Sequence, residues 1–192
     1  MDTVSFHGLE LATARGRVMT PRPTSESLVD AAVGFAGDRP VRIADVGTGS
    51  GAVAMALAVA LPNAKVVATD TCADAVLLAR ANVARLGVAD RVDVLHSSLL
   101  ESVAGPLDLV VANLPYLPEA EDGLHPDVAD EPREAVFAAG DGLGPYRDLV
   151  AASRERLAED GALAIQLRRR IVTARRDELD ALAAMFAVRA AA

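Results

Sequence analysis

The sequence has little cysteine and no apolar run long enough to span a membrane. Cys72 is the only cysteine among 192 residues, so no disulfide can form within the chain. The longest apolar run, GAVAMALAVAL at 51–61, falls short of the roughly 18 to 20 residues that a membrane-spanning helix needs. The first residues, MDTVSFHGLE, have neither the basic segment nor the apolar core of a signal peptide. We therefore expect a protein of the reducing cytoplasm with no membrane partner.

Positive charge is also scarce. The chain has 19 Lys and Arg against 27 Asp and Glu, for a net charge of -8. Because affinity for nucleic acid comes largely from Lys and Arg that displace counterions, this balance argues against a nucleic-acid partner and favours a protein or small molecule. The basic runs at Arg168–Arg170 and Ala174–Arg176 are more typical of a solvated face. No spacing of His and Cys suggests a metal site.

From Val41 onward, short apolar runs alternate with helical patterns. Helices are expected at 51–61 and 73–87, the second ending at Gly87 in a left-handed cap, and strands at 41–47, 65–70, 91–96, 107–113 and 162–167. Strands that are separated by helical crossovers pair in parallel. The sequence therefore predicts an α/β fold with a doubly wound, mostly parallel sheet. We expect one domain over 1–192, with a lead-in hairpin and helix at 1–37 and a Rossmann-like core at 38–192.

The segments around this core give less regular signals. The lead-in pattern predicts two short strands with a turn near Gly16, and then a helix that Thr24 can cap. Residues 117–145 are expected to form a long irregular loop of the kind that is usually functional. Helices are expected at 145–161 and 173–186. No seventh strand is evident after these, so we expect a truncated C-terminal sheet edge.

A glycine-rich loop, IADVGTGSGA, joins the first core strand to its helix. Gly47, Gly49 and Gly51 allow a tight turn and a close approach of a ligand to the helix N-terminus. The same residues with Ala52 also satisfy the dinucleotide pattern, and Asp70 at the end of the next strand would hold ribose hydroxyls in either case. A phosphate-loop NTPase is excluded because no Lys-Ser or Lys-Thr pair follows the glycines. The loop therefore predicts a nucleotide-like cofactor and leaves its identity open.

The strand at 107–113 ends in an amide, a proline turn and an aromatic ring: Asn113, Leu114, Pro115 and Tyr116. The carboxyl ends of strands face the ligand crevice in open α/β sheets. The Asn113 side-chain oxygen and the Leu114 carbonyl can accept two N–H bonds from a planar amino nitrogen, while Tyr116 packs on the planar group. The alternative is a turn without function, because Asn and Pro favour turns for backbone reasons.

Together, the glycine loop, Asp70 and the NLPY sequence resemble the class I S-adenosylmethionine-dependent methyltransferases. The resemblance is strongest to the HemK/PrmC family of glutamine methyltransferases, which modify peptide release factors. It is carried by FHGLEL, VMTPRPTSESLVDAA, ADVGTGSGAVAMALA and EPREAVFAAGDGLGPYRDLV. Leu114 departs from the family's usual proline and gives a form also seen in ribosomal-RNA adenine methyltransferases. The family's helical N-terminal domain is expected to be absent before Phe6.

The resemblance implies S-adenosylmethionine as cofactor and a glutamine side chain in the Gly-Gly-Gln loop of a release factor as methyl acceptor. It places the methyl acceptor at Asn113, Leu114, Pro115 and Tyr116. It places the cofactor at Asp45, Gly47, Thr48, Gly49, Ser50, Gly51, Asp70, Thr71, Ser98, Leu99 and Asn113. Ser98 and Leu99 stand where the family tends to carry an acidic residue and an aromatic, so the adenine contacts are expected to be weaker or rearranged.

Several alternatives stay open at this point. The acceptor could be a small molecule or a ribosomal-RNA adenine, and the domain could be a dinucleotide-dependent oxidoreductase or a non-catalytic binding module. Three further residues are weaker candidates: Glu26 could reach over the site, His125 could approach a substrate, and Cys72 could have a lowered pKa near a helix N-terminus. Simple structural roles explain each of the three without function.

Overall fold

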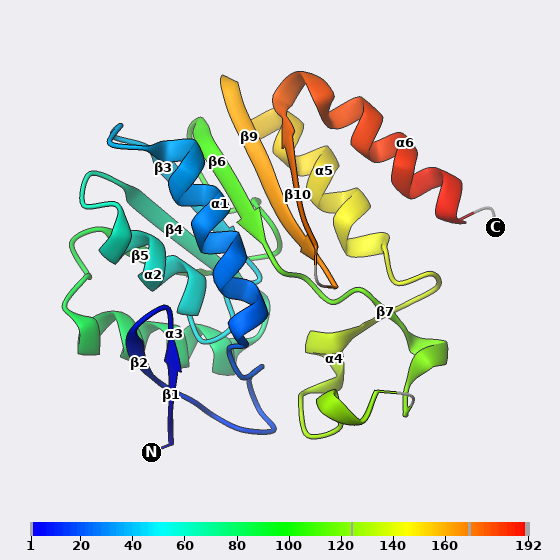
Figure 1. Ribbon diagram of the computed structural model, residues 1–192, viewed down its shortest axis with the longest axis horizontal. Helices are drawn as coiled ribbons and strands as arrows, with labels where there is room; N and C mark the ends of the chain where they lie inside the picture. Colours follow the sequence, from blue (N-terminus) through cyan, green and yellow to red (C-terminus); the bar gives the residue numbers. More distant parts are fainter. Residues whose placement is uncertain (1, 124, 169, 191–192) are drawn as a thin grey trace.

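A six-stranded sheet forms the centre of the protein in the computed structural model (Figure 1), which describes residues 2–123, 125–168 and 170–190, the last six by backbone alone. The strand order is β10-β9-β6-β3-β4-β5. The strands are β3 (Arg42–Val46), β4 (Lys65–Asp70), β5 (Val92–His96), β6 (Leu107–Ala112), β9 (Leu157–Leu167) and β10 (Arg170–Arg175). Five of them pair in parallel, as the sequence predicts, and only β10 runs antiparallel, against β9.

The topology places a crevice at one edge of this sheet. The chain runs outward from β3 to β4 and β5, and then returns to β6 on the other side of β3. In open α/β sheets, ligands bind beyond the carboxyl ends of the strands at such a reversal of order. The glycine loop follows β3 and the NLPY sequence follows β6. The fold therefore brings the two strongest motifs to one place.

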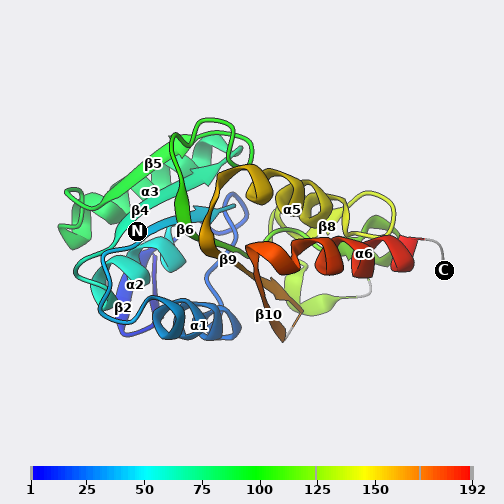
Figure 2. The same cartoon turned by 90° about the horizontal axis from the view of Figure 1, so that it is seen from above.

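Helices cover both faces of the sheet. One apolar cluster joins the sheet to α1 (Glu26–Ala36), α2 (Ala52–Ala60) and α3 (Ala73–Leu86), and a second joins the opposite face to α5 (Gly144–Arg156) and α6 (Leu179–Ala190). α1 and α5 lie on opposite sides of β9 (Figure 2). Gly87, with φ 68°, ends α3 as predicted. Within the described residues, no helix has the length and apolar character needed to cross a membrane.

The lead-in hairpin turns at a different place from the one predicted. β1 (Thr3–Phe6) pairs with β2 (Leu9–Ala12), and the two residues between them, His7 and Gly8, both have positive φ, at 49° and 76°. Two such residues match the twist of a tight hairpin. Gly16 lies in a separate turn, where the N–H groups of Arg17 and Val18 bond to the Ala14 carbonyl. The hairpin therefore turns at His7 and Gly8 and not near Gly16 as predicted, although Gly16 does lie in a turn of its own.

The predicted cap at Thr24 was also wrong. A 3-10 turn, η1 (Pro23–Ser25), precedes α1, and Ser25 is the N-cap residue but makes no side-chain cap bond. The Thr24 hydroxyl instead lies 3.4 Å from Gln166 Nε2. Both hydroxyls of this turn point to the ends of the central strands, where they meet amide side chains.

The segment at 117–145 is more structured than the irregular loop that was predicted. It contains two short strands that pair in parallel, β7 (Leu117–Pro118) and β8 (Phe137–Ala138). Between them lie η2 (Glu119–Glu121), η3 (Pro126–Val128) and α4 (Arg133–Val136). Short local elements of this kind carry no long hydrophobic period, which is why the composition alone predicted a loop.

Two predicted helices differ at the C-terminal side of the chain. α5 ends at Arg156, and LAEDG begins β9, which carries a register shift where β6 passes from Leu107 to Leu109. Residues 170–175 form β10, which takes in the first three residues of the helix predicted at 173–186. η4 (Arg176–Glu178) follows, and α6 begins only at Leu179. In β10, Arg170 and Arg175 stand at the two ends of the four residues 171–174, and the surrounding charge run concealed this strand. Arg169 of that run lies outside the described residues.

Candidate active site

A cavity of about 1770 Å³ opens beyond the carboxyl ends of β3, β4, β6 and β9. It brings together nearly all the site residues that the sequence predicted. The predicted residues that line it are Asp45, Gly47, Thr48, Gly49, Ser50, Asp70, Thr71, Ser98, Leu99, Asn113, Leu114, Pro115 and Tyr116. Gly51 is the one predicted residue that does not line it.

The glycine loop needs its glycines for three different reasons. Gly47, Gly49 and Gly51 all have positive φ, at 70°, 57° and 84°. A Cβ at Gly47 would lie 2.6 Å from Leu114 Cδ2, and one at Gly51 would lie 2.1 Å from Met55 Cε. The missing side chain at Gly47 therefore leaves room for Leu114 of the NLPY segment, and the one at Gly51 leaves room for Met55 of α2. At Gly49 no atom is nearer than Val18 Cγ1 at 4.0 Å, so this glycine leaves room for a ligand.

Asp45, in β3, is hydrogen-bonded to the glycine loop and to the start of α2. Its Oδ2 accepts a hydrogen bond of 2.6 Å from the Thr48 hydroxyl and one of 3.1 Å from the Ala54 N–H in the first turn of α2. The side chain is buried, and burial raises the pKa of its carboxyl to about 6, although both hydrogen bonds act in the opposite direction. Asp45 thus fixes the conformation of the loop. It also lines the cavity, and a contact between Asp45 and the cofactor stays a prediction.

Asp70 sits on the far side of the loop, at the end of β4. Its Oδ2 accepts a bond of 2.8 Å from Gly49 N, and its Oδ1 accepts one of 2.9 Å from Cys72 N. A carboxylate oxygen has two lone pairs, so each oxygen can still accept a hydroxyl. Cys72 is the N-cap residue of α3 but makes no side-chain cap bond, and it is half-buried in the cavity wall.

The segment after β5 is conformationally unusual. Leu99 has φ 46°, a left-handed value that is uncommon for a residue with a side chain. Its carbonyl accepts a hydrogen bond of 2.8 Å from the Thr69 hydroxyl, which holds this conformation in place. Such strained residues cluster at functional sites. Ser98 is exposed beside it, and both residues line the cavity.

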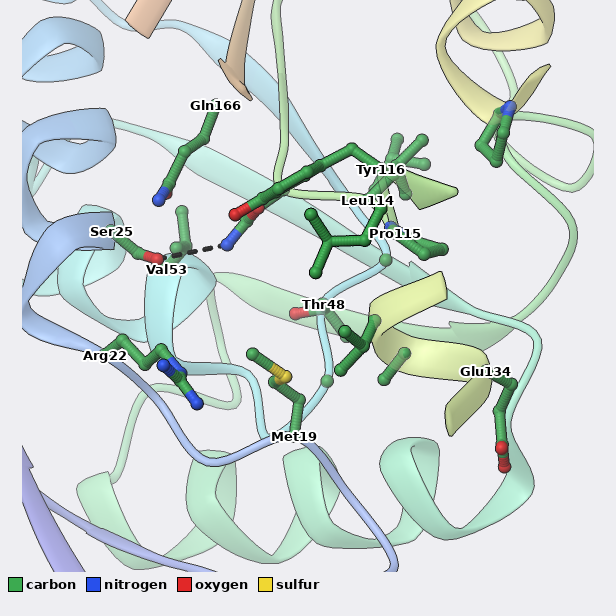
Figure 3. Close-up of a pocket in the computed structure, with 18 of the residues that line it drawn as sticks. Met19, Arg22, Ser25, Thr48, Val53, Leu114, Pro115, Tyr116, Glu134 and Gln166 are labelled. Atoms are coloured by element: carbon green, nitrogen blue, oxygen red, sulfur yellow. Dashed lines mark hydrogen bonds between the residues drawn. The ribbon is translucent and has the colours of Figure 1, made fainter. Parts of the chain in front are cut away.

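Asn113 is oriented by a residue from the lead-in. Its Nδ2 donates a hydrogen bond of 3.1 Å to Ser25 Oγ, drawn as the dashed line in Figure 3. Ser25 is 6% exposed, so little water competes for this bond. Because the amide nitrogen is turned to Ser25, the amide oxygen is left as an acceptor toward the cavity. Sequence analysis did not identify Ser25, since nothing local to PRPTSE points to Asn113.

Tyr146 holds the backbone of the NLPY segment and was also missed. Its hydroxyl lies 3.0 Å from Leu114 N, 3.0 Å from Leu114 O and 2.6 Å from Gln166 O. Tyr146 is fully buried in α5, and burial raises the pKa of its phenol. A hydroxyl has one proton, and the shortest contact takes it to Gln166 O. The Leu114 carbonyl therefore keeps acceptor capacity for a ligand.

The segment before Tyr146 packs on the same turn from behind. Gly142 has φ 80°, and a Cβ there would lie 2.4 Å from the Tyr116 carbonyl oxygen. Asp141 accepts a hydrogen bond from Leu143 N and pairs with Arg147. The sequence AGDGLGPYR therefore supports the NLPY segment, and its Asp141, Leu143 and Pro145 also line the cavity. This gives a structural reason for the two segments to occur together.

Charged side chains from three segments meet at the mouth of the cavity. The Thr20 N–H donates to Glu131 Oε2 at 2.9 Å, and Arg22 Nη1 donates to Asp127 Oδ2 at 3.2 Å. Arg168 lies 3.5 Å from Glu121. These contacts draw the lead-in and the strand end at β9 toward the segment at 119–131.

The two remaining candidates differ in outcome. His125 lines the cavity, and its ring lies 2.8 Å from Glu121. Glu26 does not reach over the site: its Oε1 accepts a hydrogen bond from His7 N and thereby holds the β1–β2 turn. Among the described residues, no three His, Cys, Asp or Glu side chains gather as a metal-binding group.

The sequence matches known methyltransferases. The family model of the methyltransferase small domain matches residues 31–131. The chain is 40% identical over 167 residues to the release factor glutamine methyltransferase of Deinococcus radiodurans, covering 85% of this chain and 59% of that protein. It is 38% identical over 172 residues to the enzyme of the same name from Bradyrhizobium diazoefficiens, covering 86% and 58%. The chain thus spans somewhat more than half the length of these relatives.

Solved structures share the fold. The ribosomal protein L11 methylase of Lactobacillus delbrueckii subsp. bulgaricus superimposes with a TM-score of 0.55 at 26% identity, over 77% of this chain and 62% of that one. The 16S rRNA N2 G1207 methyltransferase of T. thermophilus, in complex with AdoMet and guanosine, superimposes with a TM-score of 0.61 at 19% identity, over 85% and 40%. At 19% identity, the second likeness concerns the fold alone.

Proposed function

The chain belongs to the methyltransferase small domain family, and on that premise we propose that it transfers a methyl group from S-adenosylmethionine to the side-chain nitrogen of a glutamine in a peptide release factor. The relatives support this substrate, since two of them, at 38% and 40% identity, are named release factor glutamine methyltransferases. The observation that carries the chemistry is the pair of acceptors at the end of β6, where Ser25 orients Asn113 and Tyr146 holds Leu114.

The cavity residues fit the cofactor. Asp70 lies against the Gly49 backbone and can accept ribose hydroxyls, and the open space at Gly49 lets a ligand approach the loop. The adenine would lie by Ser98 and Leu99, which line the same wall. When bound, S-adenosylmethionine supplies a methyl group on a positively charged sulfur, and the sulfur becomes a neutral thioether as the new N–C bond forms.

The residues of the chain act on the acceptor nitrogen. A carboxamide nitrogen attacks poorly because its lone pair is delocalised into the carbonyl. Asn113 Oδ1 and the Leu114 carbonyl accept hydrogen bonds from its two N–H groups and orient the nitrogen toward the methyl group. The ring of Tyr116 packs on the planar carboxamide. One N–H proton is lost to water as the N–C bond forms. Catalysis is therefore mostly positioning, without a strong base.

The test is to locate the label after incubation with labelled S-adenosylmethionine. The acceptors offered are a release factor, its Gly-Gly-Gln peptide, ribosomal RNA and a metabolite extract. We expect label on the glutamine, loss of transfer in Asn113→Ala, and retention in the control Asn63→Ala, where an exposed asparagine is changed in the same way. Label on RNA or metabolites alone would reject the release-factor substrate and leave the methyltransferase activity in place.

The cofactor needs its own measurement. Calorimetry with S-adenosylhomocysteine and with NAD, run side by side, separates a methyltransferase from a dinucleotide-dependent oxidoreductase. We expect binding of S-adenosylhomocysteine only. Binding of NAD alone would overturn the proposed cofactor and the reaction with it.

A further inference from the structure

Two polar atoms in the cavity wall lack hydrogen-bond partners. Among the described residues, three buried side-chain N or O atoms have none: Arg22 Nε, Gln166 Oε1 and Ser153 Oγ. Arg22 and Gln166 both line the cavity, whereas Ser153 belongs to α5 outside it. A buried polar atom without a partner is destabilising, so each such atom calls for an explanation. For the two atoms in the cavity wall, a bound ligand can supply the missing hydrogen-bond partner.

Gln166 is the stronger of the two. It is 3% exposed, and its Nε2 already lies 3.2 Å from the Arg168 carbonyl and 3.4 Å from the Thr24 hydroxyl, so only the oxygen is left over. Gln166 directly follows Ile165, which pairs with Ala112, and Asn113 directly follows Ala112. The two amide side chains therefore stand side by side at the ends of neighbouring strands, about 4.8 Å apart in the sheet. Figure 3 shows Gln166 pointing into the site beside Tyr116.

We propose that Gln166 Oε1 accepts the backbone N–H of the glutamine whose side chain is methylated, and that Arg22 Nε donates to the carbonyl oxygen of its carboxamide. This inference rests on the proposed function and specifies the acceptor. The site then offers three acceptors, on Asn113, Leu114 and Gln166, and one donor, on Arg22. A glutamine within a peptide supplies three N–H groups and a carbonyl. An adenine amino group supplies only two N–H groups, so adenine leaves Gln166 unpaired.

The spacing of Asn113 and Gln166 fits the two nitrogens of a single glutamine residue. The side-chain and backbone nitrogens of an extended glutamine lie about 5 to 6 Å apart, close to the spacing between the two strand ends. Tyr116 is half-buried and extends across the site next to Gln166 (Figure 3), so its ring is the part that shifts to admit the N–H. Guanine also carries three N–H groups on one edge, but the net charge of -8 opposes an RNA partner.

The test combines a variant of the protein with a variant of the substrate. Kinetics are measured with labelled S-adenosylmethionine and two Gly-Gly-Gln peptides, one natural and one with an ester oxygen in place of the glutamine N–H. The protein variants are Gln166→Met, which removes the acceptor, and Ser153→Ala, which removes the buried unpaired atom outside the cavity. For the natural peptide we expect Gln166→Met to raise KM about five- to tenfold with little change in kcat. S-adenosylhomocysteine binding should stay unchanged. Any fall in Tm should be small, because Gln166→Met removes the unpaired oxygen together with two long Nε2 contacts, to the Arg168 carbonyl and the Thr24 hydroxyl.

The ester peptide decides the assignment. With the wild-type protein it should raise KM by a similar factor, and with Gln166→Met it should have no further effect. Ser153→Ala should match the wild-type protein with both peptides. If the effects of Gln166→Met and of the ester peptide on KM multiply, or if KM is unchanged in Gln166→Met, the role of Gln166 is overturned. Methylation of the glutamine by the wild-type protein would still support the proposed function. If Gln166→Met unfolds, the ester effect on the wild-type protein and a KM increase in Arg22→Lys remain as tests, and an unchanged KM in both overturns the inference. Absence of transfer from the wild-type protein to any peptide, or transfer to guanine in RNA, would reject both proposals together.

Discussion

Ser25 Oγ and Asn113 Nδ2 lie 3.1 Å apart although 88 positions separate them in the sequence. The bond turns the amide nitrogen of Asn113 to the lead-in and its oxygen to the cavity. In Ser25→Ala, the amide can rotate, and its oxygen faces the acceptor for only part of the time. We expect kcat for methyl transfer to fall about five- to tenfold, with S-adenosylmethionine affinity unchanged. Ser27→Ala, at an exposed position two residues further along the chain, is the control and should behave as wild type.

Asp70→Ala should weaken cofactor binding. A charged acceptor to ribose hydroxyls is worth roughly 1.5 to 3 kcal/mol, or about a tenfold to hundredfold change in Kd. Titration calorimetry with S-adenosylhomocysteine measures it, with Asp93→Ala on the exposed face of β5 as the control. Equal affinities in Asp70→Ala and wild type would show that Asp70 only supports Gly49 and Cys72.

Tyr146→Phe should lower both stability and activity. The change leaves Leu114 N and Gln166 O without their shared partner in a buried site, which costs about 1 to 3 kcal/mol of unfolding free energy. Urea denaturation gives this value, and the methyl-transfer assay should show reduced kcat because the Leu114 carbonyl is no longer held. Tyr116→Phe removes a half-buried hydroxyl and should leave stability near wild type. Similar stability losses in both variants would contradict the assignment.

Asp45 predicts a pH dependence of stability. Burial raises its folded-state pKa to about 6 from 3.8, so between those values the folded state holds a proton that the unfolded state has lost. The free energy of unfolding should therefore fall as pH rises through this window, by about 3 kcal/mol from this group, and level off above it. Asp45→Asn cannot ionise and should lack this component. Urea denaturation from pH 4 to 7 compares the two slopes, and parallel slopes would contradict the prediction.

Gly142→Ala should displace the NLPY segment. A Cβ there would meet the Tyr116 carbonyl oxygen at 2.4 Å, and this backbone cannot move without shifting Asn113 and Leu114. Gly140→Ala is a matched control, since Gly140 also has positive φ, at 64°, but no atom within 4 Å of its Cβ position. Both changes carry the conformational cost of about 1 to 2 kcal/mol. Only Gly142→Ala should also lose more than tenfold in kcat in the methyl-transfer assay.

Much of the central fold could be predicted from local sequence. The strands β3, β4 and β6 are short apolar runs buried on both faces, and the Gly87 cap follows from the left-handed conformation that glycine adopts most easily. The β10 strand could not, because its four uncharged residues are flanked by arginines that also suit a helix end. The short elements at 117–145 could not, because elements of two to four residues have no measurable period.

In the candidate site, too, local sequence predicted some residues and only the tertiary structure revealed the others. The sequence by itself determined the glycine loop, Asp70 and the Asn113 to Tyr116 segment as candidate site residues, because the chemistry of each can be inferred from its own residue types and its place at a strand end. Only the tertiary structure decided which side chains orient them: Ser25 for Asn113, Tyr146 for Leu114, and Gln166 beside both. These contacts join residues that are distant in the chain, and their register depends on how β6, β9 and α5 pack. That packing is a property of the whole core, so no local pattern encodes it.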